Sequence, residues 1–343
     1  MATALVTDSR YAAHTLDGHP EYAGRLTAVQ HTLEDELLAA HLVRLEPRLP
    51  DESDLLAVHA PRYLELLKET AQLDGIGMLD ADTYVTPDSY EIARLAVGGV
   101  LQAVDAVIQG DVENALAVIR PPGHHATPSM GMGFCLLNNI AIAARYAQRV
   151  YHVERVLIVD YDVHHGNGTQ DVFYADPSVM YISTHQSPLY PGTGTVLETG
   201  EAAGKGYNLN IPLTAGVGDQ GYAQVFEEIV IPAARRFAPQ LMLISAGFDG
   251  HWADPLAGMS LSLMGYDHLA RTLLAAAGTL CEGRIVFVME GGYNLVALSH
   301  GWANIGRALL GDGDVKDPLG PSHGREPSVD QIIERIKQIH KLD

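Results

Sequence analysis

The segment VDYDVHHGNGTQ, residues 159–170, places two aspartates and two adjacent histidines directly behind an apolar run. Asp162 and His164 are two positions apart, and on an extended segment that spacing puts both side chains on one side. Asp249, after another apolar run, is the best candidate for a third ligand. Two carboxylates and one imidazole suit a catalytic divalent metal, most simply Zn²⁺. A polar turn that only makes hydrogen bonds is the alternative for this motif taken alone.

A second pair of histidines, His124 and His125, follows Pro121-Pro122-Gly123. The prolines and the glycine restrict the backbone, so they give both imidazoles a fixed placement. A rigid histidine pair suits proton transfer, although structural histidines are common. Such histidines are usually oriented by an acceptor, and Asp160 and Asn167 could supply one each.

Tyr293 lies in the motif EGGYN, where two glycines allow a sharp turn. Opposite a metal ion, its phenol could donate a hydrogen bond to an oxyanion. A packed, hydrogen-bonded tyrosine is the alternative.

The elements that must position these residues are buried strands alternating with helices. Short runs rich in Val, Ile and Leu without strict alternation predict strands covered on both faces; they span 115–119, 155–160, 179–184, 240–245 and 284–290. Segments with helical periodicity separate them, at 88–109, 136–150, 222–237 and 264–280. This alternation predicts a parallel α/β sheet. Because sites in such sheets form outside the carboxyl ends of the strands, we expect the polar groups after each run to meet there.

Composition limits the function further. The 343 residues carry a formal net charge of −20, which disfavours binding to nucleic-acid phosphate. No apolar run approaches the length that spans a bilayer, and the N-terminus lacks a signal-peptide pattern. The two distant cysteines, Cys135 and Cys281, indicate a reducing compartment, so we expect a cytoplasmic protein.

The C-terminal part reads as an appendage to one domain. Residues 311–328 resemble a loop, and after them four isoleucines share one helical face; these are Ile332, Ile333, Ile336 and Ile339. We therefore expect a deacetylase-sized domain over 1–310 and, over 311–343, a loop and a helix packed on it.

Several motifs together resemble the zinc-dependent histone deacetylase family, most closely its class II branch and the bacterial homologues of that branch. They are RPPGHHA, GFCLLNNIAIAA, DYDVHHGNGTQDVFY, PGTG, SAGFDGHWADPLAG and MEGGYN, in this order and spacing, from about residue 19 to about residue 300. The resemblance implies an arginase/deacetylase fold. This is an α/β fold, a single domain with a central, mostly parallel eight-stranded sheet flanked by helices on both faces.

The resemblance also implies a role for each candidate residue. The metal ligands fall on Asp162, His164 and Asp249. His125 would be the general base and then the acid, with His124 acting mainly through its charge. Asp160 would orient His124, Asn167 would orient His125, and Tyr293 would stabilise the transition state.

The substrate tunnel and the cation sites follow in the same way. Phe134 and Tyr190 would form the walls, and the Gly133 carbonyl would accept the N–H of the scissile amide. Leu256 would face the mouth, where polyamine-specific relatives carry glutamate, and the Asp82-Thr83 region would form the rim. Family members also bind K⁺ or Na⁺. One such site matches Asp160, Asp162, His164 and Ser183, and the other matches Phe173, Asp176, Val179 and Tyr207.

These observations predict a zinc amidohydrolase that removes an acetyl or other acyl group from the ε-amino group of lysine in a protein or peptide. An acetylpolyamine or small-amide deacylase is the first alternative. A non-catalytic acetyl-lysine-binding module and a two-metal ureohydrolase are the others, and the complete ligand set and the single obvious ligand group weigh against them. Neither nucleic acid nor membrane is an expected partner, and the sequence makes no prediction of oligomeric state.

Overall fold

The computed structural model describes residues 2–35 and 38–342. Its centre is one eight-stranded sheet in which all neighbouring strands are parallel. Across the sheet the strands are β2 (Val43–Leu45), β1 (Thr3–Val6), β5 (Asn114–Ala117), β10 (Ile285–Met289), β9 (Leu241–Ala246), β6 (Val156–Asp160), β7 (Val179–Gln186) and β8 (Asn208–Leu213). A separate hairpin pairs β3 (Gly77–Met78) with β4 (Tyr84–Val85).

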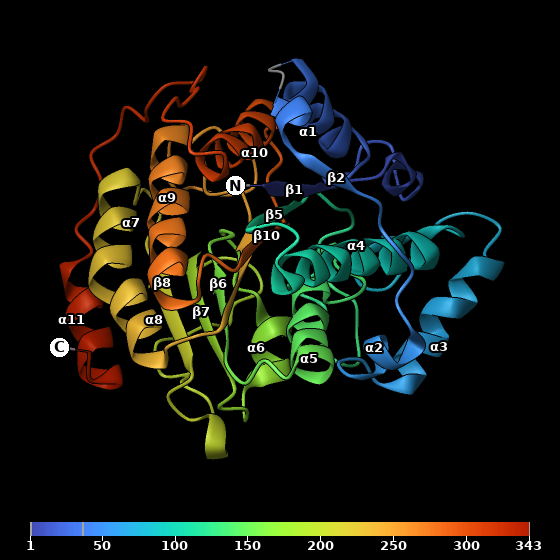
Figure 1. The fold of residues 1–343 in the computed structure, drawn as a ribbon, viewed down its shortest axis with the longest axis horizontal. Coiled ribbons are helices and arrows are strands. Elements are labelled where there is room, and N and C mark those ends of the chain that lie inside the picture. Colours follow the sequence, from blue (N-terminus) through green and yellow to red (C-terminus); the bar gives the residue numbers. More distant parts are fainter. Residues whose placement is uncertain (1, 36–37, 343) are drawn as a thin grey trace.

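Helices cover both faces of the sheet. One layer contains α1 (Gly24–Asp35), α10 (Leu295–Leu309), α9 (Leu263–Leu280), α7 (Asp219–Val225) and α8 (Ile231–Phe237), which contact one another in sequence. The other layer contains α4 (Ser89–Gln109), α5 (Asn139–Tyr151) and α6 (Asn167–Phe173), and the short α2 (Glu52–Leu56) and α3 (Pro61–Glu69) lie beyond it. In Figure 1 the yellow and orange helices α7, α8 and α9 lie on one side of the sheet, and the green helices α5 and α6 lie on the other.

The chain reverses direction across the sheet at its centre. β5 leads into α5 and β6 into α6, whereas their neighbours β10 and β9 lead into α10 and α9 on the opposite face. The loops after adjacent strands therefore diverge, which leaves a crevice at the carboxyl ends, the place where open α/β sheets bind ligands.

The predicted elements are present, and the predicted α/β fold with its eight-stranded sheet is confirmed. The five apolar runs are β5, β6, β7, β9 and β10, whose residues are nearly all buried. The predicted helix over 222–237 contains a π-helical turn, η5 (Phe226–Val230), just before Pro232. Proline has no N–H to donate back along the helix, and the wider turn accommodates this.

Three strands and two long helices were not predicted from the sequence. β1 and β2 are only four and three residues long, too short for a period to emerge. β8 contains Pro212, which argues against a central strand; it is tolerated here because β8 lies at the edge of the sheet. α1 and α10 complete the set.

The C-terminal helix α11 (Asp330–His340) packs against β8 and η5. Ile333 and Ile336 are its buried isoleucines, whereas Ile332 and Ile339 are only partly buried. Among the described residues no helix is long and apolar enough to cross a membrane.

Candidate active site and metal centre

The loops after four adjacent strands, β5, β10, β9 and β6, meet at one cavity of about 220 Å³. It is lined by Asp82, Pro122, His124, His125, Gly133, Phe134, His164, Leu189, Tyr190, Leu256, Gly291 and Tyr293. Seven of the residues expected from sequence to form the site thus share a single hollow, although they come from positions up to about 170 residues apart.

At the base of this cavity, Asp162, His164 and Asp249 have ligand-type atoms that all lie within 4.8 Å of one another. Nδ1 of His164 is 3.2 Å from Oδ1 of Asp162 and 3.1 Å from Oδ2 of Asp249. The sequence placed these three on two separate strand ends, and the pairing of β6 with β9 brings them together.

Backbone amides hold the two carboxylates in place. The Val163 N–H donates to Oδ1 of Asp249 at 3.0 Å, and the Gly291 N–H donates to Oδ2 of Asp162 at 2.8 Å. Glycine is required at 291 because a Cβ there would lie 2.1 Å from Oδ2 of Asp249. The loop after β10 therefore closes directly over the metal-ligand group.

The chemistry of these donors fits a divalent cation. Both carboxylates are fully buried, and two buried carboxylates this close need a positive charge between them. Burial disfavours a charged imidazole, but hydrogen bonds to Asp162 and Asp249 outweigh it and raise the pKa of His164 to about 10. Without a metal, a proton thus takes the position of the cation. Two carboxylate oxygens and one imidazole form a donor set that Zn²⁺ accepts.

His125 is set up as a neutral base. Its Nδ1 lies 2.8 Å from Oδ1 of Asn167. Because an amide oxygen can only accept, Nδ1 carries the proton and Nε2 is left free to take one. Burial, together with the positive charges of His124 and His164, lowers the pKa of His125 well below its ordinary value.

His124 lies beside His125, with ring centroids 4.0 Å apart, but its surroundings are acidic. Burial would lower its pKa, yet the charges of Asp162 and Asp160 prevail and raise the pKa of His124 well above its ordinary value. Its Nδ1 is 3.0 Å from Oδ2 of Asp160. Tyr181, which the sequence did not single out, donates its hydroxyl to the same oxygen at 2.9 Å. The two adjacent histidines therefore differ in charge.

Tyr293 stands at the cavity wall on the loop after β10. Its backbone N–H and that of Asn294 donate to Oδ2 of Asp254, at 2.7 and 3.0 Å. Above its ring lies the Arg25 guanidinium, 5.0 Å from the centroid. Burial raises the pKa of the phenol well above its ordinary value, so the hydroxyl keeps its proton and can donate it in a hydrogen bond.

The aromatic walls of the cavity rest on a strained turn. Phe134 has φ 69°, which is unusual for a residue other than glycine, and its N–H donates to Oγ1 of Thr83 at 3.0 Å. At the preceding Gly133, also at positive φ, a Cβ would lie 2.4 Å from the His125 ring. Tyr190 completes the wall, its ring centroid 5.1 Å from that of His125.

At the mouth, Leu256 and Asp82 both line the cavity. Asp254 does not, because its carboxylate is buried and is used by the backbone amides of Leu256, Tyr293 and Asn294. Asp82 is half-buried, and burial and the neighbouring Asp80 raise the pKa of its carboxyl.

The residues expected to bind monovalent cations are partly juxtaposed. Ser183 lies beside Asp160 in the register of β7 and β6. Of the second set, Phe173 accepts a hydrogen bond from the Asp176 N–H at 3.0 Å, and Tyr207 accepts one from the Tyr181 N–H at 2.9 Å. Both cation sites stay predictions.

Reasoning from the sequence missed a buried ion network that ties the site loops together. The Glu21 carboxylate binds Nε and Nη2 of Arg120 at 2.5 and 2.6 Å and Nη1 of Arg25 at 3.2 Å, and all three side chains are fully buried. Arg25 also donates to the carbonyls of Gly292 and Glu290. Burial disfavours the charged carboxylate, but the two arginines hold the pKa of Glu21 near 2. An arginine directly before PPGHH, at the end of an apolar run, was the available signal.

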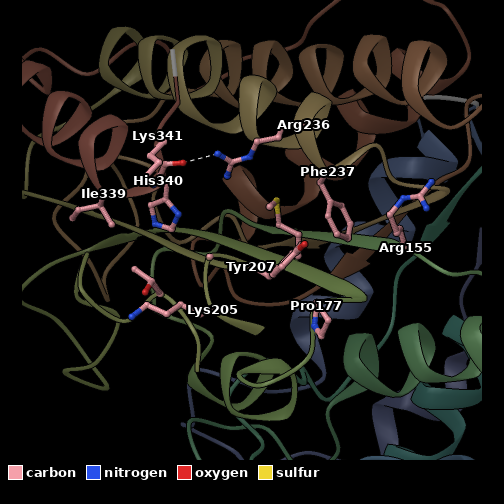
Figure 2. A pocket seen from close by; sticks show the side chains of 12 residues that line it. Arg155, Pro177, Lys205, Tyr207, Arg236, Phe237, Ile339, His340 and Lys341 are labelled. Atoms are coloured by element: carbon pink, nitrogen blue, oxygen red, sulfur yellow. Dashed lines mark hydrogen bonds between the residues drawn. The ribbon is translucent and has the colours of Figure 1, made fainter. Parts of the chain in front are cut away.

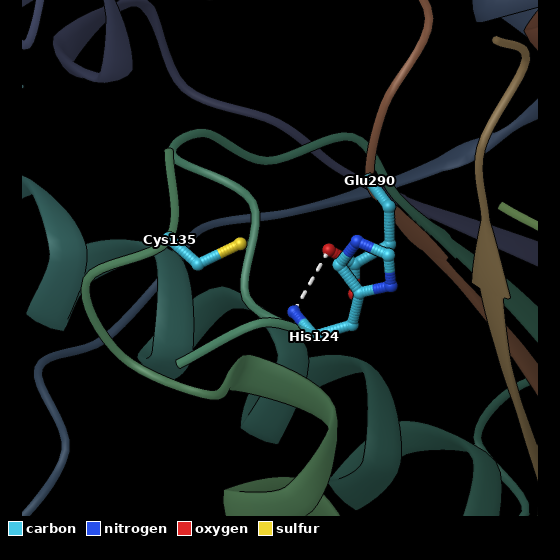
Figure 3. A group of neighbouring side chains, drawn as sticks. All are labelled: His124, Cys135 and Glu290. Carbon is cyan, nitrogen blue, oxygen red and sulfur yellow. Dashed lines mark hydrogen bonds between the residues drawn. The ribbon is translucent and has the colours of Figure 1, made fainter. Parts of the chain in front are cut away.

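Glu290 is a second residue that the sequence did not reveal. Its Oε2 accepts the N–H groups of Gly123 and His124 at 2.7 and 3.2 Å, the latter drawn in Figure 3. Glu290, His124 and Cys135 form another group of metal-ligand types among the described residues. Burial raises the pKa of the Cys135 thiol well above its ordinary value, so no thiolate is available there and Glu290 acts as a brace for the histidine loop.

Comparison with known proteins supplies the family. Residues 19–309 match the histone deacetylase domain. The chain belongs to the histone deacetylase family. It is 43% identical over 298 residues to a probable deacetylase of Archaeoglobus fulgidus, covering 86% of this chain and 82% of that protein. It is 38% identical to the chloroplastic histone deacetylase 14 of Arabidopsis thaliana, with 99% of this chain and 85% of the relative covered.

Two further relatives extend the comparison. A histone deacetylase-like amidohydrolase of Pseudomonas aeruginosa is 43% identical over 279 residues, 81% of this chain and 73% of the relative. The crystal structure of the HDA15 HD domain superposes with a TM-score of 0.90 at 36% identity, covering 99% of this chain and 96% of that one. The predicted family, fold and deacetylase class are confirmed, and zinc dependence is a property of the family.

Proposed function

We propose that this protein is a zinc-dependent amidohydrolase that removes an acetyl or other acyl group from the ε-amino group of lysine in a protein or peptide. One observation carries the proposal: a single cavity holds the Asp162/His164/Asp249 group, the free Nε2 of His125 and the Tyr293 phenol. These are a Lewis-acid site, a base and an oxyanion donor.

Asp162, His164 and Asp249 would hold the Zn²⁺ ion. When bound, zinc supplies a Lewis acid that polarises the amide carbonyl and makes water more acidic. The described residues around Asp249 offer ligands for one ion, which favours an amidohydrolase over a two-metal ureohydrolase.

The protein's own side chains then move the protons. Nε2 of His125 takes a proton from the attacking water, and the hydrogen bond from its Nδ1 to Asn167 keeps the ring oriented. The Tyr293 hydroxyl donates to the oxyanion of the tetrahedral intermediate. The His125 imidazolium returns the proton to the leaving amine, while the charge of His124 favours the oxyanion.

The shape of the cavity suits an acyl-lysine stem. Phe134, Tyr190 and Leu256 offer apolar surface to a tetramethylene chain. The Gly133 carbonyl accepts only the Cys135 thiol, at 3.4 Å, so a lone pair remains for the N–H of the scissile amide.

A second candidate substrate class, acetylated polyamines, is favoured by Asp82. This is the one carboxylate among the cavity-lining residues outside the metal group, and it could pair with a distant ammonium. Leu256 opposes that reading because it offers no charge at the mouth. We expect lysine to prevail.

The test is a kcat/KM comparison of acetyl-lysine peptides, longer acyl-lysine peptides and N8-acetylspermidine with zinc-loaded protein. Acetyl-lysine should be preferred, and Leu256→Glu should shift the ratio toward the polyamine by about 10- to 100-fold, since specificity is a difference of affinities. Leu256→Gln is the matched control, because it adds polarity at similar volume without charge.

A parent enzyme that prefers acetylspermidine would overturn the lysine assignment, and loss of that preference in Asp82→Asn would identify the responsible carboxylate. Tight binding of acetyl-lysine peptides without turnover would instead show a binding module.

We also propose that K⁺ or Na⁺ supports the site from behind, at Asp160 and Ser183. The support is their adjacency in the sheet and the full burial of both side chains. Removal of monovalent cations should lower activity without removing zinc.

A further inference from the structure

A second hollow, of about 490 Å³, lies at the opposite end of the sheet from the catalytic cavity. Its walls come from the segments just before β6, β7 and β8 and from the C-terminal ends of α8 and α11 (Figure 2). The twelve lining residues are Arg155, Pro177, Met180, Thr199, Lys205, Gly206, Tyr207, Arg236, Phe237, Ile339, His340 and Lys341, called here the basic pocket. Because the strands are parallel and rise about 3.3 Å per residue, this pocket and the catalytic cavity are separated by the length of the strands.

The charge of this pocket is opposite to that of the whole molecule. Four of its twelve lining residues are Lys or Arg and none is Asp or Glu. In the full chain Asp and Glu number 42 and Lys and Arg only 22. Such a local reversal of sign in an acidic protein concentrates anions at one place.

Two of the cations already have backbone partners. Nη1 of Arg236 donates to the His340 carbonyl at 2.5 Å, and Nε of Arg155 donates to the Ala238 carbonyl at 2.7 Å. These contacts satisfy the carbonyl ends of α11 and α8, which would otherwise repel an anion. They also fix both guanidinium groups, and each keeps further N–H groups unused.

The remaining polar groups lack partners. Within the described part of the chain, no hydrogen bond or ion pair engages the Lys205 or Lys341 ammonium, and Arg155 alone of the four cations has a carboxylate nearby, that of Glu154 at 3.6 Å. His340 is 93% buried, and no residue in the described ranges bonds to its ring nitrogens. Its ring faces the pocket in Figure 2. Capping of helix ends therefore explains the two arginines but leaves two lysines and a buried imidazole without a role.

The floor of the pocket is aromatic. Tyr207 and Phe237 contact each other edge to face, with centroids 5.9 Å apart, and both line the pocket. A ring or another apolar group of a ligand could pack there.

We propose that the basic pocket binds a small organic phosphate, with its phosphate groups among Lys205, Arg236 and Lys341 and its apolar part on Tyr207 and Phe237. Lysine and arginine together match a phosphate dianion, through point charge and through paired N–H groups respectively. His340 adds an uncharged N–H donor, since burial and the nearby Arg236 lower its pKa to about 4.

The experiment is calorimetric titration of the zinc-loaded chain with ADP, pyrophosphate and adenosine. ADP should bind at one site per chain, more weakly as salt is raised. Lys205→Met and Lys341→Met should each raise Kd about ten-fold, the effect of one charge-assisted hydrogen bond. Lys68→Met is the matched control. It makes the same charge change on α3, where the ammonium pairs with Glu52 and Glu65, and it should leave Kd within about two-fold.

The catalytic cavity is the competing location for a bound anion. A hydroxamate, which chelates zinc through two oxygens, should therefore leave ADP binding unchanged, and metal content should be the same before and after titration. Absence of saturable ADP binding at millimolar concentration, displacement by the hydroxamate, or equal weakening by Lys68→Met would overturn the proposal. Adenosine binding as tightly as ADP would overturn the phosphate contacts, and pyrophosphate binding as tightly as ADP would overturn the aromatic ones.

Discussion

At the carboxyl ends of the strands, the catalytic cavity is small, about 220 Å³, and its polar groups are bonded to one another. At the amino ends, the basic pocket is larger, about 490 Å³, and two of its lysines and a histidine bond to nothing in the described chain. Both hollows lie where loops and helix ends meet the same sheet.

The difference shows what each end is built for. At the carboxyl ends every reactive side chain is braced by a residue of another loop, and the loops are braced in turn by the Glu21, Arg25 and Arg120 network. Such bracing fixes geometry before a substrate arrives, which is what a reaction requires. At the amino ends the unpaired cations leave the final contacts to a ligand. Substitutions should therefore act on catalysis at one end only.

The largest effect is expected for Asp249→Ala. The metal group would lose one of its two carboxylates, so turnover should fall more than about 10⁴-fold and bound zinc should drop well below one ion per chain. Circular dichroism should change little, because the residue lies beyond the end of β9. Asp171→Ala, an exposed change on α6, is the control. Retained zinc with retained activity would remove Asp249 from the metal centre.

Arg120→Met tests the bracing itself. It leaves the Glu21 carboxylate buried with one arginine only, so the free energy of unfolding should fall by about 3–5 kcal/mol. Denaturant titration measures it. The matched change Arg44→Met breaks an exposed pair with Glu34 and should cost less than about 1 kcal/mol. Equal losses from both variants would mean that the network does not hold the loops.

Tyr293→Phe removes one hydroxyl and little volume. We expect kcat to fall about 10²- to 10³-fold with little change in KM, because the lost hydrogen bond forms only in the transition state. Tyr207→Phe makes the same change at the basic pocket and should leave kcat unchanged. If the two tyrosines behaved alike, the contrast between the two ends would fail.

The smallest effect is expected for Lys205→Met in buffer without phosphate. Its kcat/KM should stay within about two-fold of the parent, since the side chain is exposed and lies at the far end of the sheet. Steady-state assays with an acetyl-lysine peptide measure this. A large loss would mean that the two ends are coupled even without a ligand.

The sequence by itself determined the elements and the chemical inventory. The apolar runs are strands because Val, Ile and Leu suit a backbone covered on both faces, and a polar residue after each run must emerge at the same edge of a parallel sheet. Asp162, His164, His124, His125 and Tyr293 could therefore be assigned to one site before any coordinates. Those assignments depended on local spacing and on motifs, which are properties of short segments.

Only the tertiary structure decided which residues face each other. Glu21, Arg25 and Arg120 lie up to 99 residues apart in sequence, and nothing in their local patterns pairs them. Asp254 could not be separated from Asp82 as the acid at the cavity mouth until the loop after β10 was seen to occupy it. The basic pocket likewise exists only because α8, α11 and three strand starts converge. Contacts across the chain depend on how the elements pack, and packing is decided by the burial of all of them together.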